Sequence, residues 1–374
     1  MKVRGALLRE LGFPAPYATS RPLEIAELEL DEPGPDEILV RVRAAGLCHS
    51  DLSVIDGSRP RVMPMVLGHE AAGEVAEVGP DVQELVPGDH VVLSFVPACG
   101  ECPACLAGKG WLCEPGGAAN AAGTLLSGAR RLHDATGAPV NHHLGVSAFC
   151  DHVVVSARSA VKVDPALEFE LAALFGCAVL TGVGAVLNAA RVEPGETVAV
   201  FGLGGVGLAA LLGARVASAG SIVAVDRIES KLDLALELGA SEALLAGPGV
   251  AEAVRELTGG GADKVIETVG DAAVLAQAYA ATRRGGTVVT VGLPHPEQML
   301  SIPAVSLVTE ERTLRGSYLG SSLPSRDIPR LVAMHREGRL PVERLLSARI
   351  GLEQINEGFD ALASGEVVRQ VVVF

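Results

Sequence analysis

The first 160 residues alternate between apolar and polar positions in short runs, which is the pattern of β-strands. Residues 38–43 alternate with a period of two after the turn-forming segment 33–35, and residues 73–78 do the same. A further apolar run, 91–95, follows a Pro-Gly-Asp turn. We therefore expect the first part of the chain to be rich in β-structure.

Further along, short apolar strands alternate with helical segments. A helical pattern covers 168–190 with a break at Gly176-Cys177, and another covers 208–219. Alternation of strands and helices is typical of a parallel sheet covered by helices. The chain ends on a strand, 369–374, that we expect to return to the first domain. The other strands predicted in this part are 197–201, 222–225, 264–269 and 286–291.

The composition supports two packed domains. The chain has 374 residues, of which 49% are hydrophobic, and 44 glycines. It is long enough for two cores and too apolar for a disordered protein. We predict an α/β protein with a β-rich domain, residues 1–178 and 320–374, and a doubly wound domain, residues 179–319.

Charge and apolar runs limit the functional classes. The formal net charge of −15 argues against a nucleic-acid partner, because binding to phosphates requires clustered Lys and Arg. A charge comes too early for a signal peptide, and no uncharged apolar run approaches about 18 residues. We expect a cytoplasmic protein without a membrane span. In that compartment the seven cysteines favour metal binding or reactivity over disulfides.

Four cysteines close together give the clearest chemical signal. Cys99, Cys102, Cys105 and Cys113 are separated in part by Gly, Pro and Ala, so the loop can fold around a metal. Four thiolates leave no position for water, and the spacing therefore predicts a structural zinc site in a lobe at 95–115. Disulfides and an iron–sulfur cluster are the alternatives.

A second group of candidate metal-site residues begins at Gly-Leu-Cys48-His-Ser50-Asp51. A thiolate can bind a metal, a neighbouring hydroxyl can pass a proton, and a carboxylate can orient an imidazole ligand. A polar turn with a free cysteine is the alternative. Two other segments carry similar groups. His69 and Glu70 lie at a bend between predicted strands, where a surface or core position is the alternative.

The remaining cysteines and histidines differ in what they indicate. Cys177 follows a glycine break between two predicted helices, which exposes it to one side and suits a ligand. Cys150 is expected to be a small buried apolar residue. His133, His142 and His143 lack the spacing and the acidic or thiol partner of a metal site, so we expect no metal there.

A glycine-rich turn predicts a dinucleotide site. Gly202, Gly204 and Gly207 lie between a predicted strand and a predicted helix, which is the setting of the dinucleotide-binding fingerprint. The next strand ends in Asp226, about 20 residues beyond the glycines, as expected for an acid that binds the ribose. This carboxylate favours NAD over NADP, although Arg227 beside it counts against that preference.

In this order, these motifs resemble the zinc-dependent medium-chain alcohol dehydrogenases over nearly the whole chain. The segment 116–145 resembles the insertion in the longer, typically dimeric animal and plant enzymes and in glutathione-dependent formaldehyde dehydrogenases. The resemblance implies a GroES-like β-rich catalytic domain, a Rossmann domain for NAD, two zinc ions per subunit and a homodimer. It rests on Gly-Leu-Cys48-His-Ser-Asp, Gly68-His69-Glu70, the four-cysteine lobe, Gly176-Cys177, Gly202 to Gly207 with Asp226, and Ile355 to Asp360.

The resemblance also assigns roles near the catalytic zinc. Cys48, His69 and Cys177 would bind the ion and leave one position open, the ligand set that is known for alcohol dehydrogenase. Ser50 would take the hydroxyl proton of the alcohol, and Asp51 would orient His69. Glu70 would lie behind the metal. Relatives often carry a histidine where this chain has Ser53, which leaves the outer end of the proton relay unassigned.

The cofactor and the substrate are assigned in the same way. His49 and Arg369 would face the pyrophosphate, Val206 would back the nicotinamide, and Lys231 would reach the adenosine ribose. Arg59 and His143 stand where relatives often have apolar side chains. The full cofactor set is His49, Thr181, Gly202, Gly204, Gly205, Val206, Gly207, Asp226, Lys231 and Arg369. The substrate pocket would be lined by Phe95, Leu144, Leu293 and Tyr318, which suggests an apolar alcohol or aldehyde.

Three functions follow from these assignments. The first is an NAD-dependent alcohol dehydrogenase for primary or aromatic alcohols. The second is a formaldehyde dehydrogenase that acts on a thiol adduct, or a relative that keeps its nicotinamide tightly bound. The third is a redox-sensing cofactor-binding protein without turnover, which has no need of zinc with an open position. The physiological substrate, the direction and the oligomeric state are not determined by the sequence.

Overall fold

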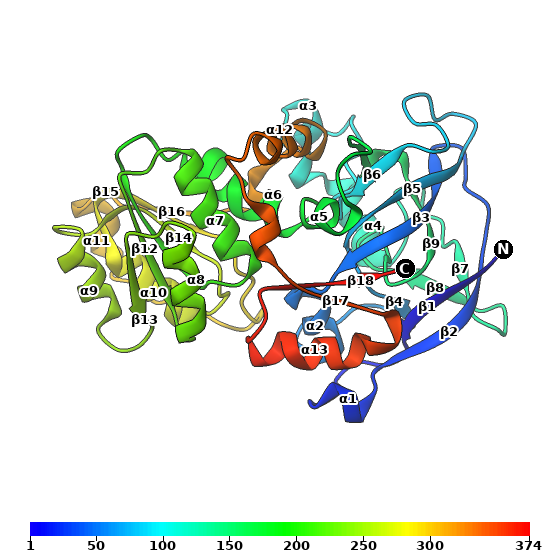
Figure 1. The fold of residues 1–374 in the computed structure, drawn as a ribbon, viewed down its shortest axis with the longest axis horizontal. Coiled ribbons are helices and arrows are strands. Elements are labelled where there is room, and N and C mark those ends of the chain that lie inside the picture. The colour runs from blue at the N-terminus through cyan, green and yellow to red at the C-terminus, as the bar shows by residue number, and fades with distance from the viewer. The chain divides into compact units, whose positions relative to one another are not determined.

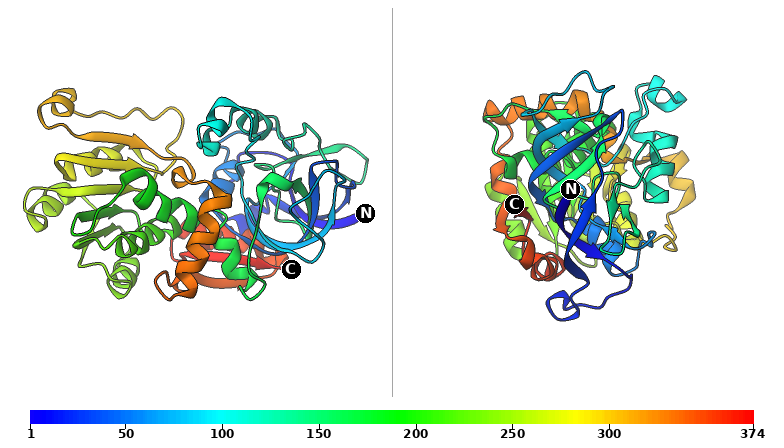
Figure 2. Two further views of the ribbon diagram at one scale, coloured as in Figure 1. Left: turned by 90° about the horizontal axis from the view of Figure 1, so that it is seen from above. Right: turned by 90° about the vertical axis from the view of Figure 1, so that its right-hand side faces the viewer.

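The structure, a computed structural model, describes residues 1–374 and divides into two compact units. Unit 1 consists of Met1–Cys177, Leu323–Val332 and Leu346–Phe374, and unit 2 of Ala178–Ser322 and Ala333–Leu345. Both chain ends lie in unit 1 (Figure 1; Figure 2). Residues 320–322 and 333–345 cluster with unit 2, whereas the sequence-based ranges placed all of 320–374 in the first domain.

Unit 1 contains a small closed barrel. The barrel strands are β1 (Lys2–Leu8), β2 (Leu23–Leu30), β4 (Met65–Val66), β7 (Leu132–His133) and β8 (Pro139–His142). They are hydrogen-bonded in the order β1-β2-β7-β8-β4. Leu7, Leu8 and Leu23 are almost completely buried, and because neighbouring residues of a strand point to opposite faces, Leu7 and Leu8 show that β1 is covered on both faces.

A seven-stranded sheet forms the rest of the β-structure in unit 1. Its strands are β3 (Glu37–Gly46), β5 (Glu70–Val78), β6 (His90–Leu93), β9 (His152–Ser156), β10 (Ala160–Lys162), β17 (Leu346–Ile350) and β18 (Arg369–Val373). The path is β10-β6-β5-β3-β18-β17, and β9 also pairs with β3. Pairing of β18 with β3 confirms that the last strand returns to the first domain.

Short helices in unit 1 connect the strands. They are α1 (Tyr17–Ser20), α2 (His49–Ile55), α3 (Pro103–Leu106), α4 (Glu114–Ala122), α5 (Phe169–Leu174) and α13 (Ile355–Ser364). The buried side chain of Asn356 on α13 donates to the carbonyl and accepts from the N–H of Leu23. Asp360 accepts from the N–H groups of Tyr17 and Ala18. The Ile355 to Asp360 motif therefore attaches α13 to the N-terminal segment.

Unit 2 is built on a six-stranded parallel sheet, as the βα alternation predicts. Its strands are β11 (Thr197–Phe201), β12 (Ser221–Asp226), β13 (Glu242–Leu245), β14 (Ala262–Glu267), β15 (Thr282–Thr290) and β16 (Thr313–Gly316). The order is β13-β12-β11-β14-β15-β16. The order reverses between β11 and β14, and ligands of such sheets bind at this point, beyond the carboxyl ends of the strands.

Helices cover both faces of this sheet (Figure 1). Phe201 and Val223 belong to a core cluster with residues of two helices, whereas their strand neighbours Val200 and Ile222 are buried on the opposite face. None of the helices in the chain has both the length and the apolarity of a membrane span. The helices of unit 2 are α6 (Ala178–Gly184), which continues as a π-helix to Ala190, α7 (Gly205–Val216), α8 (Glu229–Glu237), α9 (Val250–Leu257), α10 (Ala272–Ala281) and α11 (Ala304–Thr309), and α12 (Pro324–Arg336) belongs to both units.

A buried histidine in the barrel predicts loss of stability in acid. Burial, with a smaller effect of Arg130 and Arg131, lowers the pKa of His142 to about 4, and its Nε2 accepts a hydrogen bond from Arg131 N. Between about pH 6.5 and 4, His142 is protonated in the unfolded chain but stays neutral in the folded chain. We expect the free energy of unfolding to fall by about 3 kcal/mol over this range, at about 1.4 kcal/mol per pKa unit.

Urea unfolding at pH 6.5 and pH 4.5 checks this expectation in the wild-type protein and in His142→Gln. The variant should show a smaller loss between the two pH values. His133→Gln is the matched control, because His133 is only partly buried and pairs with Asp31. Equal acid sensitivity of wild type and His142→Gln would contradict the assignment to His142.

Candidate active site

Strands β3 and β5 bring the first two predicted catalytic zinc ligands together. Gly46 pairs with Glu70, so Cys48 just after β3 lies beside His69 just before β5. Cys177 comes from the segment between α5 and α6. The ligand atoms of Cys48, His69 and Cys177 all lie within 4.8 Å of one another, and the three side chains are buried. The structure therefore brings together the three residues that the sequence singled out.

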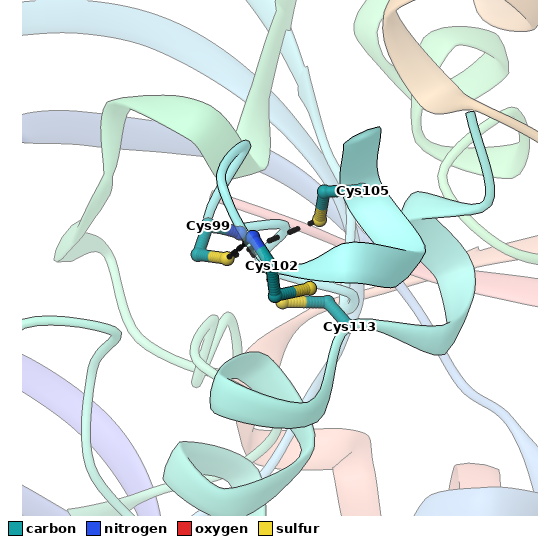
Figure 3. Close-up of side chains that lie close together, drawn as sticks. All are labelled: Cys99, Cys102, Cys105 and Cys113. Atoms are coloured by element: carbon teal, nitrogen blue, oxygen red, sulfur yellow. Dashed lines mark hydrogen bonds between the residues drawn. The ribbon is translucent and has the colours of Figure 1, made fainter. Parts of the chain in front are cut away.

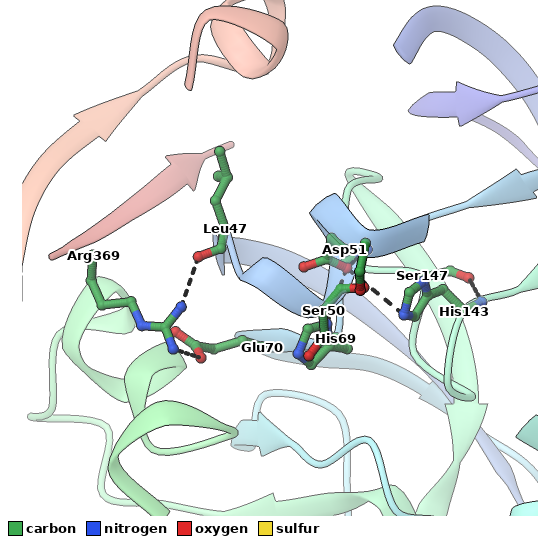
Figure 4. A network of polar contacts seen from close by, with 10 residues as sticks. Leu47, Ser50, Asp51, His69, Glu70, His143, Ser147 and Arg369 are labelled. Carbon is green, nitrogen blue, oxygen red and sulfur yellow. Dashed lines mark hydrogen bonds and ion pairs between the residues drawn. The ribbon is translucent and has the colours of Figure 1, made fainter. Parts of the chain in front are cut away.

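Asp51 holds the imidazole of His69 in one orientation (Figure 4). His69 Nδ1 lies 3.0 Å from Asp51 Oδ1, and Gly68 N donates to the same oxygen at 3.1 Å. Because a carboxylate only accepts, Nδ1 carries the proton and Nε2 is left for a metal. Gly68 has a φ of 91°, and an added Cβ would lie 2.6 Å from Phe149 N. Only glycine fits this bend, which places His69.

Two rings support His69 from its sides. Phe95 contacts it edge to face, with ring centroids 5.3 Å apart, and His143 stacks on it at 5.6 Å with an angle of 14°. His143 Nε2 is 3.9 Å from Asp51 Oδ1. Asp51, His69 and His143 thus form a second close group of possible ligands. Since Asp51 and His69 already bind each other, we interpret this group as the support of the first one.

The two cysteines share a strongly polarised environment. A hydrogen bond from Cys177, opposed by burial and aided by Arg369 and His69, lowers the pKa of Cys48 well below its ordinary value. The same contact raises the pKa of Cys177 well above its ordinary value. A divalent cation between the sulfurs would stabilise both as thiolates, because metal binding displaces thiol protons.

Arg369 supplies a positive charge that sequence reasoning did not place here. The residue is 3% exposed, and its guanidinium donates to Leu47 O at 2.8 Å and lies 3.7 Å from Glu70 Oε2 (Figure 4). Burial opposes its charge, but Glu70, Cys48 and Cys177 hold the pKa of Arg369 well above its ordinary value. Its role toward a pyrophosphate stays a prediction, whereas its place beside the cysteines is a direct finding.

The donor set of this site fits zinc. Two thiolates and one imidazole are ligands that zinc prefers, and three protein ligands leave a position for water or substrate, as in catalytic sites. All three donors are buried, and Asp51 orients the imidazole as in known zinc centres. The group can therefore hold a Lewis-acidic ion with an open position.

The four-cysteine cluster forms a second, separate centre (Figure 3). The ligand atoms of Cys99, Cys102, Cys105 and Cys113 lie within 4.8 Å of one another, and all seven cysteines are free. Backbone N–H groups donate to sulfur, for example Cys102 N to Cys99 Sγ at 3.3 Å. The pKa of Cys102 is lowered to about 7, mainly by a hydrogen bond from the backbone of Cys105. Four sulfurs that can reach one ion fit the predicted structural zinc, and because all four are free cysteines, the disulfide alternative is excluded in this structure.

In unit 2 the glycine-rich turn has the geometry that its sequence indicates. Gly202 has a φ of 89°, and a Cβ on Gly207 would lie 1.8 Å from Gly202 O. Gly204 caps α7, which begins at Gly205, and Val206 follows in its first turn. An added Cβ on Gly182 of α6 would lie 2.2 Å from Val206 O, so α6 packs closely on the start of α7. The list of cofactor candidates held on these elements is Thr181, Gly202, Gly204, Gly205, Val206 and Gly207.

Asp226 stands at the carboxyl end of β12, next to this turn. Its carboxylate accepts from Leu203 N at 2.6 Å and from Ile228 N at 3.0 Å. Lys231 on α8 is 8% exposed, and burial, opposed by Asp226, lowers the pKa of Lys231. Asp226 therefore fixes the turn as well as offering its remaining lone pairs to a ligand.

The remaining candidates lie in different parts of the chain. His49 is exposed at the start of α2, and Ser53 Oγ donates to the carbonyl of the half-buried Ser50. Arg59 N donates to Ser53 O. In unit 1, Phe95 and Leu144 are 7% exposed. In unit 2, Leu293 and Tyr318 are exposed; the substrate role of these four residues stays a prediction.

The three histidines of the 131–145 segment have different partners. His133 pairs with Asp31, His142 accepts from Arg131, and only His143 approaches the Cys48 group. The expectation for Cys150 is confirmed, because its side chain is fully buried.

Replacing Asp51 tests the orientation of His69. We expect Asp51→Asn to weaken zinc binding by about 10- to 100-fold, the usual effect of losing the partner of a histidine ligand. Competition with a chromogenic chelator measures the affinity. Asp56→Asn, at the exposed end of the same helix, is the control and should bind zinc like the wild type. Unchanged affinity in Asp51→Asn would contradict the role.

Comparisons with known proteins agree with this geometry. The family model described as alcohol dehydrogenase GroES-like domain matches residues 34–165, and the model described as zinc-binding dehydrogenase matches residues 205–336. The NDMA-dependent alcohol dehydrogenase of Amycolatopsis methanolica is 39% identical over 100% of this chain and 99% of its own length. This chain belongs to the zinc-binding medium-chain alcohol dehydrogenase family.

Other members of this alcohol dehydrogenase family are also similar along their whole length. The geraniol dehydrogenase of Castellaniella defragrans is 39% identical, with 100% of this chain and 98% of that protein covered. The crystal structure of the benzyl alcohol dehydrogenase of Acinetobacter calcoaceticus superposes with a TM-score of 0.93 at 32% identity, covering 100% and 99% of the chains. The predicted pair of a GroES-like domain and a Rossmann-type domain is thus confirmed.

Proposed function

We propose that this protein is an NAD-dependent zinc alcohol dehydrogenase that interconverts alcohols, preferably primary or aromatic ones, and their aldehydes or ketones. The observation that carries the proposal is the buried group of Cys48, His69 and Cys177, with Asp51 behind His69. Such a group is needed for an open zinc and not for a purely structural cofactor-binding protein. The preference for an apolar substrate is supported by Phe95 beside His69 and by relatives named for geraniol and benzyl alcohol.

Each residue near the metal has a task in this proposal. Zinc, when bound, would act as a Lewis acid that lowers the pKa of the alcohol, and NAD would accept the hydride. Ser50, in the first turn of α2, would receive the hydroxyl proton. Asp51 keeps His69 Nε2 directed at the ion, and Arg369 offsets the negative charge of Cys48 and Cys177. The burial of Cys48, His69 and Cys177 would keep water away from these ligands when zinc is bound.

A tightly bound nicotinamide is the second candidate. It is supported by the 39% identity to a relative named as dependent on NDMA, a compound other than NAD. In that case the protein would oxidise an alcohol and be reoxidised by a second substrate while NAD stays bound. The metal group and the glycine-rich turn are the same in both candidates.

Absorbance at the NADH band separates the two candidates. Zinc-loaded protein is mixed with NAD or NADP and with aliphatic, allylic, aromatic and thiol-adduct alcohols. Turnover with added NAD on one class supports the first candidate. No turnover without a second oxidant, together with one nicotinamide per chain released on denaturation, supports the tightly bound form. A protein that shows no turnover and holds no nicotinamide would refute both candidates.

Asp226→Ala tests the choice of cofactor. We expect the KM for NAD to rise by at least about tenfold with a smaller change in kcat, because the lost hydrogen bonds to the ribose act in binding. The preference for NAD over NADP should decrease, since the carboxylate no longer repels a 2′-phosphate. Steady-state kinetics with both cofactors measure this. An unchanged KM for NAD would defeat the ribose assignment.

We also propose that the protein is a cytoplasmic homodimer. All seven cysteines are free, which suits a reducing compartment. Strand β16 is the edge of the sheet in unit 2, and Val305 and Val308 on α11 are 67% and 79% exposed. An open sheet edge and exposed apolar residues in the same unit are suited to pairing with a second copy. Light scattering after gel filtration gives the mass, and a monomer would contradict the proposal.

A further inference from the structure

Glu267 is a buried carboxylate for which sequence reasoning found no role. It is the last residue of β14 and is 1% exposed. Its Oε1 accepts from Val269 N and Gly270 N, both at 2.7 Å, and its Oε2 accepts from Thr290 Oγ1 at 2.6 Å. Burial raises the pKa of Glu267, and these hydrogen bonds oppose the increase. The side chain thus ties the turn 268–270 to the end of β15.

The turn 268–270 is also attached to the glycine-rich turn. Thr268 Oγ1 lies 3.1 Å from Phe201 O and 3.0 Å from Gly202 O and donates to both. A Cβ on Gly202 would lie 2.7 Å from Val269 Cγ2. The turn 268–270, which Glu267 holds through the N–H groups of Val269 and Gly270, therefore contacts the glycine-rich turn that follows β11.

On its other side, the same turn packs against the segment that follows β15. The backbone carbonyl of Glu267 accepts from Val291 N at 2.9 Å. A Cβ on Gly292 would lie 2.1 Å from Gly270 N, and one on Gly270 would lie 2.6 Å from Leu293 N. The turns after β11, β14 and β15 thus form one packed layer, with Glu267 beneath it.

Two apolar side chains project from this layer. Val269 is 51% exposed and Leu293 is 49% exposed, although both are held by tightly packed backbone. We call these two residues the apolar pair. They stand at the carboxyl ends of strands in the β14-β15-β16 half of the sheet. In a doubly wound sheet, one half binds one nucleotide of a dinucleotide, and the glycine-rich turn with Asp226 marks the other half as the adenosine side.

We propose that Glu267 is a positioning residue that holds the apolar pair in place for the nicotinamide half of the cofactor. The assignment rests on the NAD site proposed above. The flat ring of a nicotinamide would lie against Val269 and Leu293, and the three hydrogen bonds to Glu267 would keep these side chains from moving apart. The residue acts through the turn and does not itself contact the cofactor.

The chemistry of the contact shows which substitutions matter. Two backbone N–H groups and one hydroxyl donate to Glu267. A replacement side chain must therefore accept from the two N–H groups. Toward Thr290 it can either accept or donate, because a hydroxyl does both. Glutamine satisfies this: its oxygen can accept both N–H groups and its NH₂ can donate to Thr290 Oγ1. Leucine has a similar volume but cannot accept, so it leaves the N–H groups of Val269 and Gly270 without this partner and releases the turn.

Binding of NADH and of AMP by Glu267→Leu and Glu267→Gln tests the proposal. NADH affinity is measured by fluorescence and AMP affinity by calorimetry. We expect Glu267→Leu to bind NADH about tenfold or more weakly, the size of one lost set of hydrogen bonds, and to bind AMP within about twofold of the wild type. Glu267→Gln should resemble the wild type in both. Kinetically, the KM for NAD should rise in Glu267→Leu more than kcat falls.

Other outcomes overturn the assignment. Unchanged NADH affinity in Glu267→Leu, or an equal loss of NADH and AMP, would show that the carboxylate does not serve the nicotinamide half. If Glu267→Leu does not fold, Thr290→Val, which removes one of the three hydrogen bonds, should weaken NADH selectively, and an unchanged affinity there refutes the proposal. A wild-type protein that binds AMP and NADH equally well would refute the nicotinamide platform, whereas one that binds neither would refute the cofactor itself.

Discussion

Turnover is expected to fall by about 10³-fold or more in Cys48→Ala while the protein stays folded. A Lewis-acidic zinc contributes several kcal/mol to lowering the barrier, and each 1.4 kcal/mol or so corresponds to a factor of ten. Cys48 supplies one of the three buried ligands. Its side chain makes no capping hydrogen bond to α2, so its loss should leave the helix in place. Initial rates of NADH formation and a melting curve by circular dichroism measure the two effects.

Cys150→Ala is the matched control for this experiment. Cys150 is equally buried but belongs to neither cysteine group, and burial raises the pKa of its thiol to about 12. We expect turnover near that of the wild type. If both variants lose activity to the same extent, the loss comes from cysteine removal in the core and not from the metal group.

Cys102→Ala should act mainly on stability. Structural zinc binds with about 10 kcal/mol or more in small domains, and loss of one of four ligands should remove a good part of that. A cost of about 3 kcal/mol would lower the melting temperature by about 10 °C. We expect zinc to fall from two ions to one per chain and the lobe 95–115 to become sensitive to protease. Metal analysis and limited proteolysis at a temperature below melting measure these changes.

The comparison of the two variants separates the two centres. Cys102→Ala should keep most of its turnover at low temperature, because its cluster shares no ligand with the group of Cys48. Cys48→Ala should keep the four-cysteine lobe protected. If both variants unfold to the same extent, the division into a catalytic and a structural zinc is wrong.

Those parts of the site that depend on local spacing could be predicted from the sequence. The four cysteines lie within one loop, and the glycine-rich turn carries its own strand and helix, so each motif contains its geometry. The catalytic group was harder, because Cys48, His69 and Cys177 are far apart in the chain. The pairing of Gly46 with Glu70 brings Cys48 beside His69, and the segment between α5 and α6 brings Cys177 to them. Their grouping came from the family resemblance.

Contacts that depend on long-range packing were missed. Arg369 is an ordinary charge at the start of a terminal strand, and nothing near it in sequence indicates that it lies beside Glu70. Glu267 ends an apolar strand and gives no motif, although its three hydrogen bonds organise a whole layer of turns. Strand β17 was overlooked because five alternating residues, Leu346–Ile350, are too short to distinguish from a turn.

The order of the chain has a consequence for its synthesis on the ribosome. Strand β18 completes the sheet of unit 1 beside β3, yet it follows unit 2 in the chain and is made after it. Unit 2, apart from residues 333–345, has left the ribosome by then, at a rate of about 5–20 residues per second. The nascent N-terminal half must therefore wait with the β3 edge unpaired, and with Cys48 lacking the charge of Arg369, until β18 has been made. A stop codon before Arg369 would leave the zinc ligands present but this edge permanently open.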